Sequence, residues 1–215
     1  MTETSAAQLI RAVEQADSTS RLVAAVQNLA EAKVEAGIST LIAVFGYNNP
    51  TAAVAAVQGL IQLGSVAVQP LIEQLDDYNY GARAYAIRAL AAIADPRALD
   101  ILLAAAATDF APSVRRAAAK GLGGLHWNSL TPEAQIIAQT KALDTLNLIA
   151  NDSDWSIRYA AVVGLQALAT TSNLTQQIQT QFEQMRQTET DAAVRARIEL
   201  ATQIPNAIQA PTANI

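Results

Sequence analysis

The chain has 215 residues, of which 51% are hydrophobic and 5% aromatic, and it carries a net charge of −5. Charged residues make up only 15%, against roughly 25% in ordinary globular domains, so a large apolar area must be covered within the fold or by a partner. The absence of cysteine and the single histidine exclude disulfides, thiolate or multi-histidine metal sites and a cysteine nucleophile, and the 14 Lys and Arg residues form no basic stripe for nucleic acid.

The N-terminal half reads as one short helix followed by three helix pairs. Apolar residues at helical spacing predict a capping helix over residues 3–16. Pro50 separates the first pair from the second, because proline cannot donate a hydrogen bond inside a helix, and Gly64 ends a helix. The predicted pairs are 20–30 with 34–45, 51–63 with 66–75, and 81–94 with 96–107.

The C-terminal half adds two pairs, a last helix and a tail. The fourth pair has a longer loop between its helices, from His126 to Thr131. The predicted ranges are 109–125 with 132–150, 153–169 with 174–188, a terminal helix over 191–203, and a loose tail over 206–215. The N-terminus is polar and the apolar runs are shorter than the ~20 residues of a membrane span, so we expect neither a secretory signal nor membrane insertion.

Anchor leucines recur along these pairs at intervals of 31, 30, 32 and 43 residues, at Leu29, Leu60, Leu90, Leu122 and Leu165. Such an interval is the length of two helices and their turns. The sequence therefore predicts an all-α fold, a right-handed α-solenoid of HEAT-like helical-hairpin repeats that forms a single domain over residues 1–205.

An arginine recurs in four of the predicted helices, at Arg83, Arg115, Arg158 and Arg195. Carboxylates occupy the turns of the same repeats, at Asp77, Asp109, Asp152 and Asp191. We expect each arginine to reach the carboxylate of the adjacent repeat and form a structural ladder. A ligand contact by any one arginine is the alternative.

Aromatic residues gather in the turns between helices, at Tyr78, Tyr80, Phe110, Trp127 and Trp155. If the stack is regular, the turns form one rim, where a planar conjugated ligand would meet ring faces, carboxylates and arginines. The alternative is that these rings are anchors that plug the ends of the helix pairs. His126 is either a loop residue or a ligand contact.

Two segments, 78–97 and 109–127, resemble the F-type subunit of the E/F class of phycobilin lyases. The string Tyr-Asn-Tyr-Gly-Ala-Arg-Ala-Tyr-Ala-Ile-Arg over 78–88 is the more specific part, and the resemblance extends over residues 20–169. It implies a cyanobacterial, cytoplasmic phycocyanobilin:phycocyanin α-subunit lyase that works as a heterodimer with an E-type subunit. Related lyase-isomerase F subunits carry a His-Cys pair, which this chain lacks, so simple lyase action is favoured.

The resemblance implies phycocyanobilin as the substrate, no separate cofactor and no metal. The acceptor cysteine of the phycocyanin α subunit adds to the ethylidene group of the bilin, so the lyase orients the reactants and moves protons. We expect Asp77 or Asp109 to act as the catalytic carboxylate that pairs with the pyrrole nitrogens. The expected substrate-binding residues are Tyr78, Tyr80, Trp127 and Trp155 for the rings, Arg83, Arg115 and Arg158 for acidic groups, and His126.

Two other functions fit a helical-repeat chain. One is a non-catalytic scaffold for protein interactions, since most such arrays bind proteins. The other is a bilin chaperone, or a lyase that detaches bilins during phycobilisome turnover.

Overall fold

The computed structural model describes residues 3–75 and 79–203, and every regular element in these ranges is helical. The prediction of an all-α fold of paired helices is confirmed. The chain divides into two compact units, Met1–Ile101 (unit 1) and Leu102–Ile215 (unit 2), with the boundary inside α7, Leu99–Thr108. The single domain over residues 1–205 stays a prediction, and the predicted tail over 206–215 lies outside the described residues.

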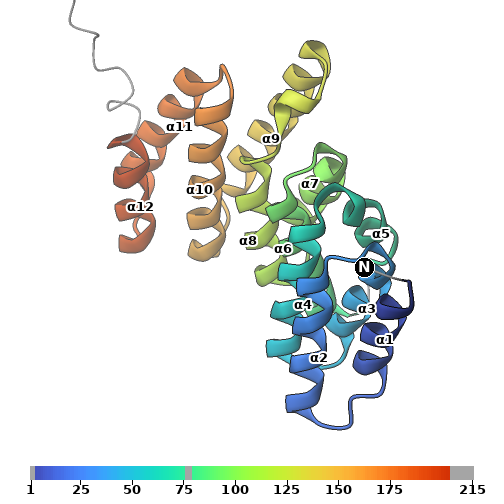
Figure 1. The fold of residues 1–215 in the computed structure, drawn as a ribbon. Helices are drawn as coiled ribbons and strands as arrows, with labels where there is room; N and C mark the ends of the chain where they lie inside the picture. The colour runs from blue at the N-terminus through green and yellow to red at the C-terminus, as the bar shows by residue number, and fades with distance from the viewer. Residues whose placement is uncertain (1–2, 76–78, 204–215) are drawn as a thin grey trace, which may run out of the picture. The chain divides into compact units, whose positions relative to one another are not determined.

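Unit 1 is a stack of helical hairpins (Figure 1). The first helices of its pairs lie side by side, and the N-terminal helix packs against the first of them. The second helices are short and each is preceded by a 3-10 turn, which the sequence did not indicate. The elements are α1 Glu3–Glu14, α2 Thr19–Ala32, η1 Glu35–Gly37, α3 Ile38–Ala43, η2 Val44–Gly46, α4 Pro50–Leu63, η3 Gly64–Ala67, α5 Val68–Glu73, α6 Tyr80–Ile93 and η4 Pro96–Ala98.

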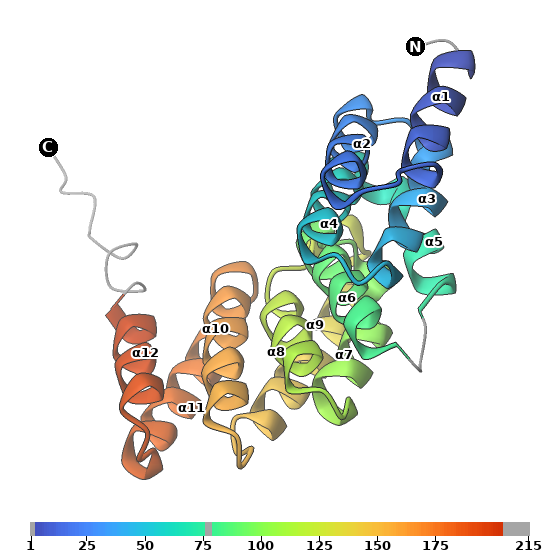
Figure 2. The same cartoon turned by 90° about the horizontal axis from the view of Figure 1, so that it is seen from below.

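Unit 2 repeats this arrangement with longer second helices (Figure 2). The first helices of its pairs again form a row, in which α10 lies between α8 and α12, while α9 and α11 pack against α10 from the other layer. The elements are α8 Pro112–Leu122, η5 Trp127–Ser129, α9 Pro132–Ile149, α10 Trp155–Thr171, α11 Thr175–Thr188 and α12 Ala192–Gln203.

Helix starts and stops follow local chemistry. A side-chain oxygen accepts a hydrogen bond from the first turn at Asn49, Asn79 and Asp154, which satisfies an amide that the helix leaves without a partner. Gly64 ends α4 with φ 70°, a backbone region that glycine adopts without steric cost. The predicted stop at this glycine is confirmed.

The cores of both units consist of branched and small side chains. All five anchor leucines of the sequence repeat are buried. Small residues let neighbouring first helices approach closely: a Cβ added to Gly59 of α4 would lie 2.6 Å from the Cβ of Ala30 on α2. In unit 2, a Cβ added to Gly123 would lie 1.9 Å from the carbonyl oxygen of Gly164 on α10.

One helical stretch, residues 50–73, is long and apolar enough on paper to cross a membrane, with a mean hydropathy of 1.6. The turn at Gly64 divides it into α4 and α5, which belong to one hairpin of the stack. The 14 residues of α4 alone are fewer than the ~20 that a bilayer requires. Within its apolar window, 44% is buried inside the fold.

Candidate functional site

The turns that precede the first helices of unit 2 share one hydrogen-bonding pattern. An acidic residue stands two positions before the helix cap and accepts the cap's backbone N–H at 2.8 Å, as in the pairs Asp109 with Ala111, Asp152 with Asp154, and Glu189 with Asp191. The acidic residue of each turn therefore fixes the backbone from which the next helix starts.

Two of these carboxylates also accept hydrogen bonds from an arginine of the preceding repeat. Arg115 of α8 donates from Nη2 to Asp152 Oδ2 at 2.6 Å. Arg158 of α10 makes a bidentate pair with Glu189, with Nε and Nη2 each 2.7 Å from a carboxylate oxygen. The expected ladder of charges thus exists in unit 2. Its last acceptor is Glu189, whereas the sequence pointed to Asp191, which instead caps α12.

Glu189 is the most enclosed carboxylate of the ladder, with its side chain 4% exposed. The hydrogen bonds from Arg158 lower the pKa of Glu189, and burial opposes this only in part. A carboxylate with a lowered pKa and a bidentate partner is a poor proton acceptor at neutral pH. Glu189 therefore serves to join two repeats rather than to transfer protons.

Of the two predicted catalytic carboxylates, the structure describes only Asp109. Asp77 lies outside the described residues, as does Tyr78. Asp109 occupies the position that Asp152 and Glu189 hold in the next turns, and its Oδ1 accepts from Ala111 N. Its role in catalysis stays a prediction.

The arginines predicted to bind substrate are engaged within the protein. Arg83 of α6 is buried, while Arg115 and Arg158 hold their ladder carboxylates and also donate to backbone carbonyl groups. A ligand would have to compete with these partners, so the ladder arginines are weak candidates for direct ligand contact.

Exposed aromatic rings stand at the starts of the first helices in both units. Tyr80 is 59% exposed in unit 1, and Phe110 and Trp155 are 71% and 49% exposed in unit 2. Tyr47, also exposed, stands in the turn before α4 and was missed because its segment lacks the recurring arginine. Each ring lies within two residues of a helix cap, so large apolar surfaces recur at one place in the repeat.

Trp127 differs from these rings, because it is only 2% exposed. Of the two interpretations of Trp127, its burial favours the anchor: the 3-10 turn η5 carries the indole into the core. Within the described part of the chain, its buried Nε1 has no hydrogen-bond partner. His126 and Trp127 line a hollow of about 510 Å³ with Gln135 and Thr170–Asn173. Ligand binding by His126 and Trp127 stays a prediction.

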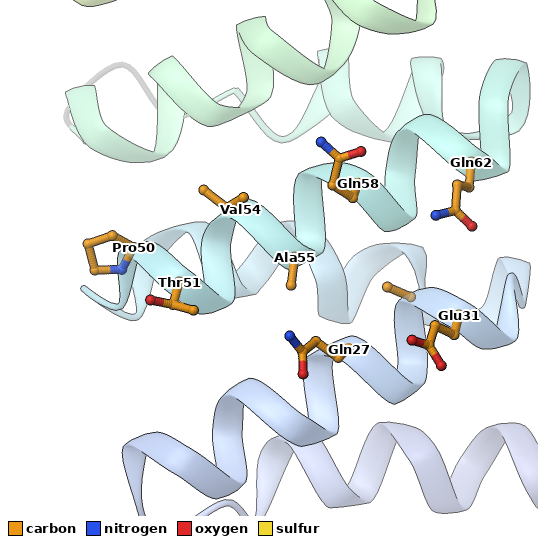
Figure 3. A pocket seen from close by; sticks show the side chains of 9 residues that line it. Gln27, Glu31, Pro50, Thr51, Val54, Ala55, Gln58 and Gln62 are labelled. Carbon is orange, nitrogen blue, oxygen red and sulfur yellow. The ribbon is translucent and has the colours of Figure 1, made fainter.

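A second hollow, of about 580 Å³, lies between α2 and α4 in unit 1 (Figure 3). Gln27 and Glu31 border it from α2, and Gln58 and Gln62 border it from α4, above an aliphatic floor. Both hollows fall in the size range of small-molecule sites. Among the residues for which the structure gives positions, no cluster of His, Asp or Glu side chains suits a metal ion.

Comparison with known proteins gives one family model and several close relatives. The model of HEAT repeats matches residues 68–135. The chain is 62% identical over 194 residues to the phycocyanobilin lyase subunit beta of Nostoc sp. (strain PCC 7120), a match that covers 90% of this chain and 97% of the relative. It is 55% identical over 161 residues to the phycocyanin alpha phycocyanobilin lyase CpcF of Synechocystis sp., covering 75% of each.

Solved structures agree with these relatives. A chain in the complex of CpcE and CpcF of phycocyanin lyase from Nostoc sp. PCC7120 is 63% identical, covers 78% of this chain and 98% of its own length, and gives a TM-score of 0.76. A designed armadillo repeat protein matches with a TM-score of 0.53 at 18% identity, which supports the helical-repeat fold alone.

Proposed function

The chain belongs to the family of the phycocyanobilin lyase beta subunits, and we propose that it is the F-type subunit of a heterodimeric lyase. The lyase attaches phycocyanobilin to a cysteine of the phycocyanin α subunit. The observation that carries the proposal is the 62% identity with a lyase subunit along 97% of that subunit's length. The paired subunit, by the same argument, is an E-type chain of the CpcE kind.

The reaction is an addition. The S–H bond of the acceptor cysteine breaks, sulfur bonds to one carbon of the bilin ethylidene group, and the proton ends on the conjugated system at the far end of the former double bond. No group leaves and nothing is oxidised. Because this chain has no cysteine, the nucleophile belongs to the acceptor.

The lyase contributes orientation, and holding two reactants in place lowers a barrier by up to about 7–11 kcal/mol in the best cases. In this proposal an exposed ring at a helix start, Tyr80 in unit 1 or Trp155 in unit 2, provides an apolar face for the tetrapyrrole. Phycocyanobilin is the substrate, and we assign the lyase no separate cofactor.

A carboxylate beside the pyrrole nitrogens would keep the bilin cationic and electrophilic. Asp77 and Asp109 are the proposed carboxylates, although Asp109 also holds its own turn. Asparagine keeps an oxygen that accepts the Ala111 N–H and removes only the charge. If Asp77→Asn and Asp109→Asn both leave the attachment rate unchanged, this part of the mechanism is wrong.

Reconstitution tests the proposal. The acceptor α subunit, phycocyanobilin and an E-type subunit are combined with and without this chain, and the covalent coloured adduct is measured after denaturation. We expect the adduct to depend on this chain. A scaffold without catalytic function would bind partners and give no increase in adduct, and a detaching lyase would release bilin from the finished subunit faster than it attaches bilin.

Two further properties belong to the proposal. Size-exclusion chromatography of the two subunits alone and mixed should show a heterodimer, since long apolar faces and a charged fraction of 15% favour association. The site of action is the cytoplasm, where phycocyanin is assembled in the family that the sequence resembles. A chain that ignores an E-type partner would contradict the heterodimer.

A further inference from the structure

Arg116 differs from the arginines of the ladder in what it binds. It lies on α8 directly after Arg115, and its Nη1 donates to the hydroxyl of Ser156 on α10 at 3.0 Å. That hydroxyl in turn donates to Asp154 Oδ1 at 2.7 Å. The guanidinium is thus held across two neighbouring helices by a neutral oxygen, and the carboxylate of Asp154 is one hydrogen bond further away.

The remaining donors of Arg116 carry the inference. Within the described ranges, Arg115 and Arg158 each hold a carboxylate directly, whereas Arg116 makes the one hydrogen bond to Ser156. A guanidinium has five N–H donors in a planar fork that matches both oxygens of a carboxylate. Arg116 is therefore a fixed cation with donors that the protein itself does not use.

The surroundings of Arg116 suit an acidic conjugated ligand. Lys120 lies one turn further along the same face of α8, is exposed, and forms no ion pair in the described part of the chain. On α10, the half-exposed ring of Trp155 directly precedes Ser156, and Tyr159 follows Trp155 by one helical turn on the same face. The hydrogen bond between Arg116 and Ser156 thus joins a helix that carries two cations to a helix that carries two aromatic side chains.

The positions of these groups are fixed by close packing. A Cβ added to Gly123, the C-terminal cap of α8, would clash with the backbone of Gly164 on α10, so the end of α8 contacts the backbone of α10. Asp154, which lies near Arg116, is held as the cap of α10 by Ser156, and these hydrogen bonds, with the charge of Arg116, lower the pKa of Asp154. The cation, its hydroxyl partner and the ring are therefore preorganised.

We propose that Arg116 and Lys120 form a carboxylate site that holds the propionate side chains of the bilin, while Trp155 supports a tetrapyrrole ring. This inference rests on the proposed function and names the residues that bind the acidic groups of its substrate. The acid-binding role thus passes from the ladder arginines Arg115 and Arg158 to Arg116. The rate of attachment then depends on Arg116 through the binding of bilin.

The test compares Arg116→Gln with the wild-type chain in the reconstituted heterodimer. Glutamine keeps a donor for Ser156 and removes the charge. A lost hydrogen bond to a charged group weakens binding by about 10-fold or more, so we expect KM for bilin to rise about 10-fold at nearly constant kcat. Arg186→Gln, on the exposed surface of α11, makes the same change in net charge and should leave KM unchanged.

The dimethyl ester of the bilin separates a ligand contact from a structural one. The ester should raise KM for the wild-type chain and add nothing further in Arg116→Gln, because the interaction is already lost. Equal KM values for acid and ester with the wild-type chain would overturn the inference. So would an equal rise for both ligands in the variant, which would mean that Arg116 binds a protein partner.

Equilibrium binding keeps the test independent of catalysis. Titration of the heterodimer with free acid and ester, followed by the bilin absorption band, measures the same preference without attachment. If the wild-type heterodimer prefers the acid yet forms no adduct, the proposed function fails and the site stands. If adduct forms at the same rate from acid and ester, the site fails and the function stands.

Discussion

The backbone contact between α8 and α10 yields the sharpest prediction, the substitution Gly123→Ala. Gly123 has φ −76° and ψ −23°, which alanine adopts freely, so the substitution brings no backbone strain. The new Cβ would lie 1.9 Å from the Gly164 carbonyl oxygen, about 1.5 Å short of the 3.4 Å at which ordinary contact begins. A rigid carbonyl group cannot rotate away as a side chain can, so the helices must separate.

The cost follows from that separation. Inserting a methyl group into a well-packed contact costs about 1–3 kcal/mol, and a gap of 0.5–1 Å forfeits a quarter to a half of each dispersion contact it opens. Because α8 and α10 meet along several turns, we expect Gly123→Ala to lower the free energy of unfolding by about 3 kcal/mol. Urea denaturation followed by circular dichroism at 222 nm measures the loss.

Gly124→Ala is the matched control. It adds the same methyl group one residue later, where the nearest atom outside the immediate chain is 3.9 Å away. Alanine also restricts the unfolded chain, so the control should be neutral or slightly stabilising, by up to about 1 kcal/mol. If the two variants unfold within about 0.5 kcal/mol of each other, the close approach of α8 and α10 is not what holds unit 2 together.

Three further outcomes are expected. Glu189→Gln should lower the free energy of unfolding by about 3 kcal/mol at pH 7, because it leaves Arg158 without its charged partner. Since the pKa of Glu189 is lowered in the folded state, the difference in stability from wild type should shrink as pH falls below about 4.3 and vanish below the folded-state pKa. A difference that does not change with pH would contradict this. In Trp155→Phe the remaining tryptophan fluorescence should come from the buried Trp127 and resist quenching by iodide. In Trp127→Phe it should come from the exposed Trp155 and be quenched by iodide. Phe110→Ser should slow attachment several-fold and change stability by less than about 0.5 kcal/mol, and a normal rate would remove Phe110 from the site.

The fold was predictable because one physical pattern repeats along the chain. Each anchor leucine needs a buried place, and small residues around it let the next helix approach, so the period of about 31 residues dictates pairs of helices. The 3-10 turns that precede α3 and α5 were missed, since no strong propensity distinguishes them from helix ends. The approach of Gly123 to Gly164 was missed because sequence carries no distances between helices.

The site was predicted less completely, for reasons that particular residues make plain. Asp191 was chosen as the last acceptor of the ladder because aspartate recurs in the other turns, yet Glu189 holds the equivalent position two residues before the cap. Trp127 was considered for the rim because it lies in the long loop of the fourth pair, whereas η5 turns it inward. Arg116 was passed over because nothing in the sequence distinguishes a paired arginine from its unpaired neighbour.

The ladder of unit 2 has a direction, and this bears on how such chains grow and shrink. Each acceptor stands two residues before a cap and each arginine four residues after one, so every repeat offers a cation to its successor and an anion to its predecessor. Deleting residues 152–188 would bring Glu189 to the position of Asp152, so Arg115 would again meet an acid and no charge of the ladder would lose its partner. Whole repeats are therefore the natural unit of duplication and loss. An insertion inside a turn would instead change the spacing between an acid and its helix cap and so disturb its pairing with the arginine.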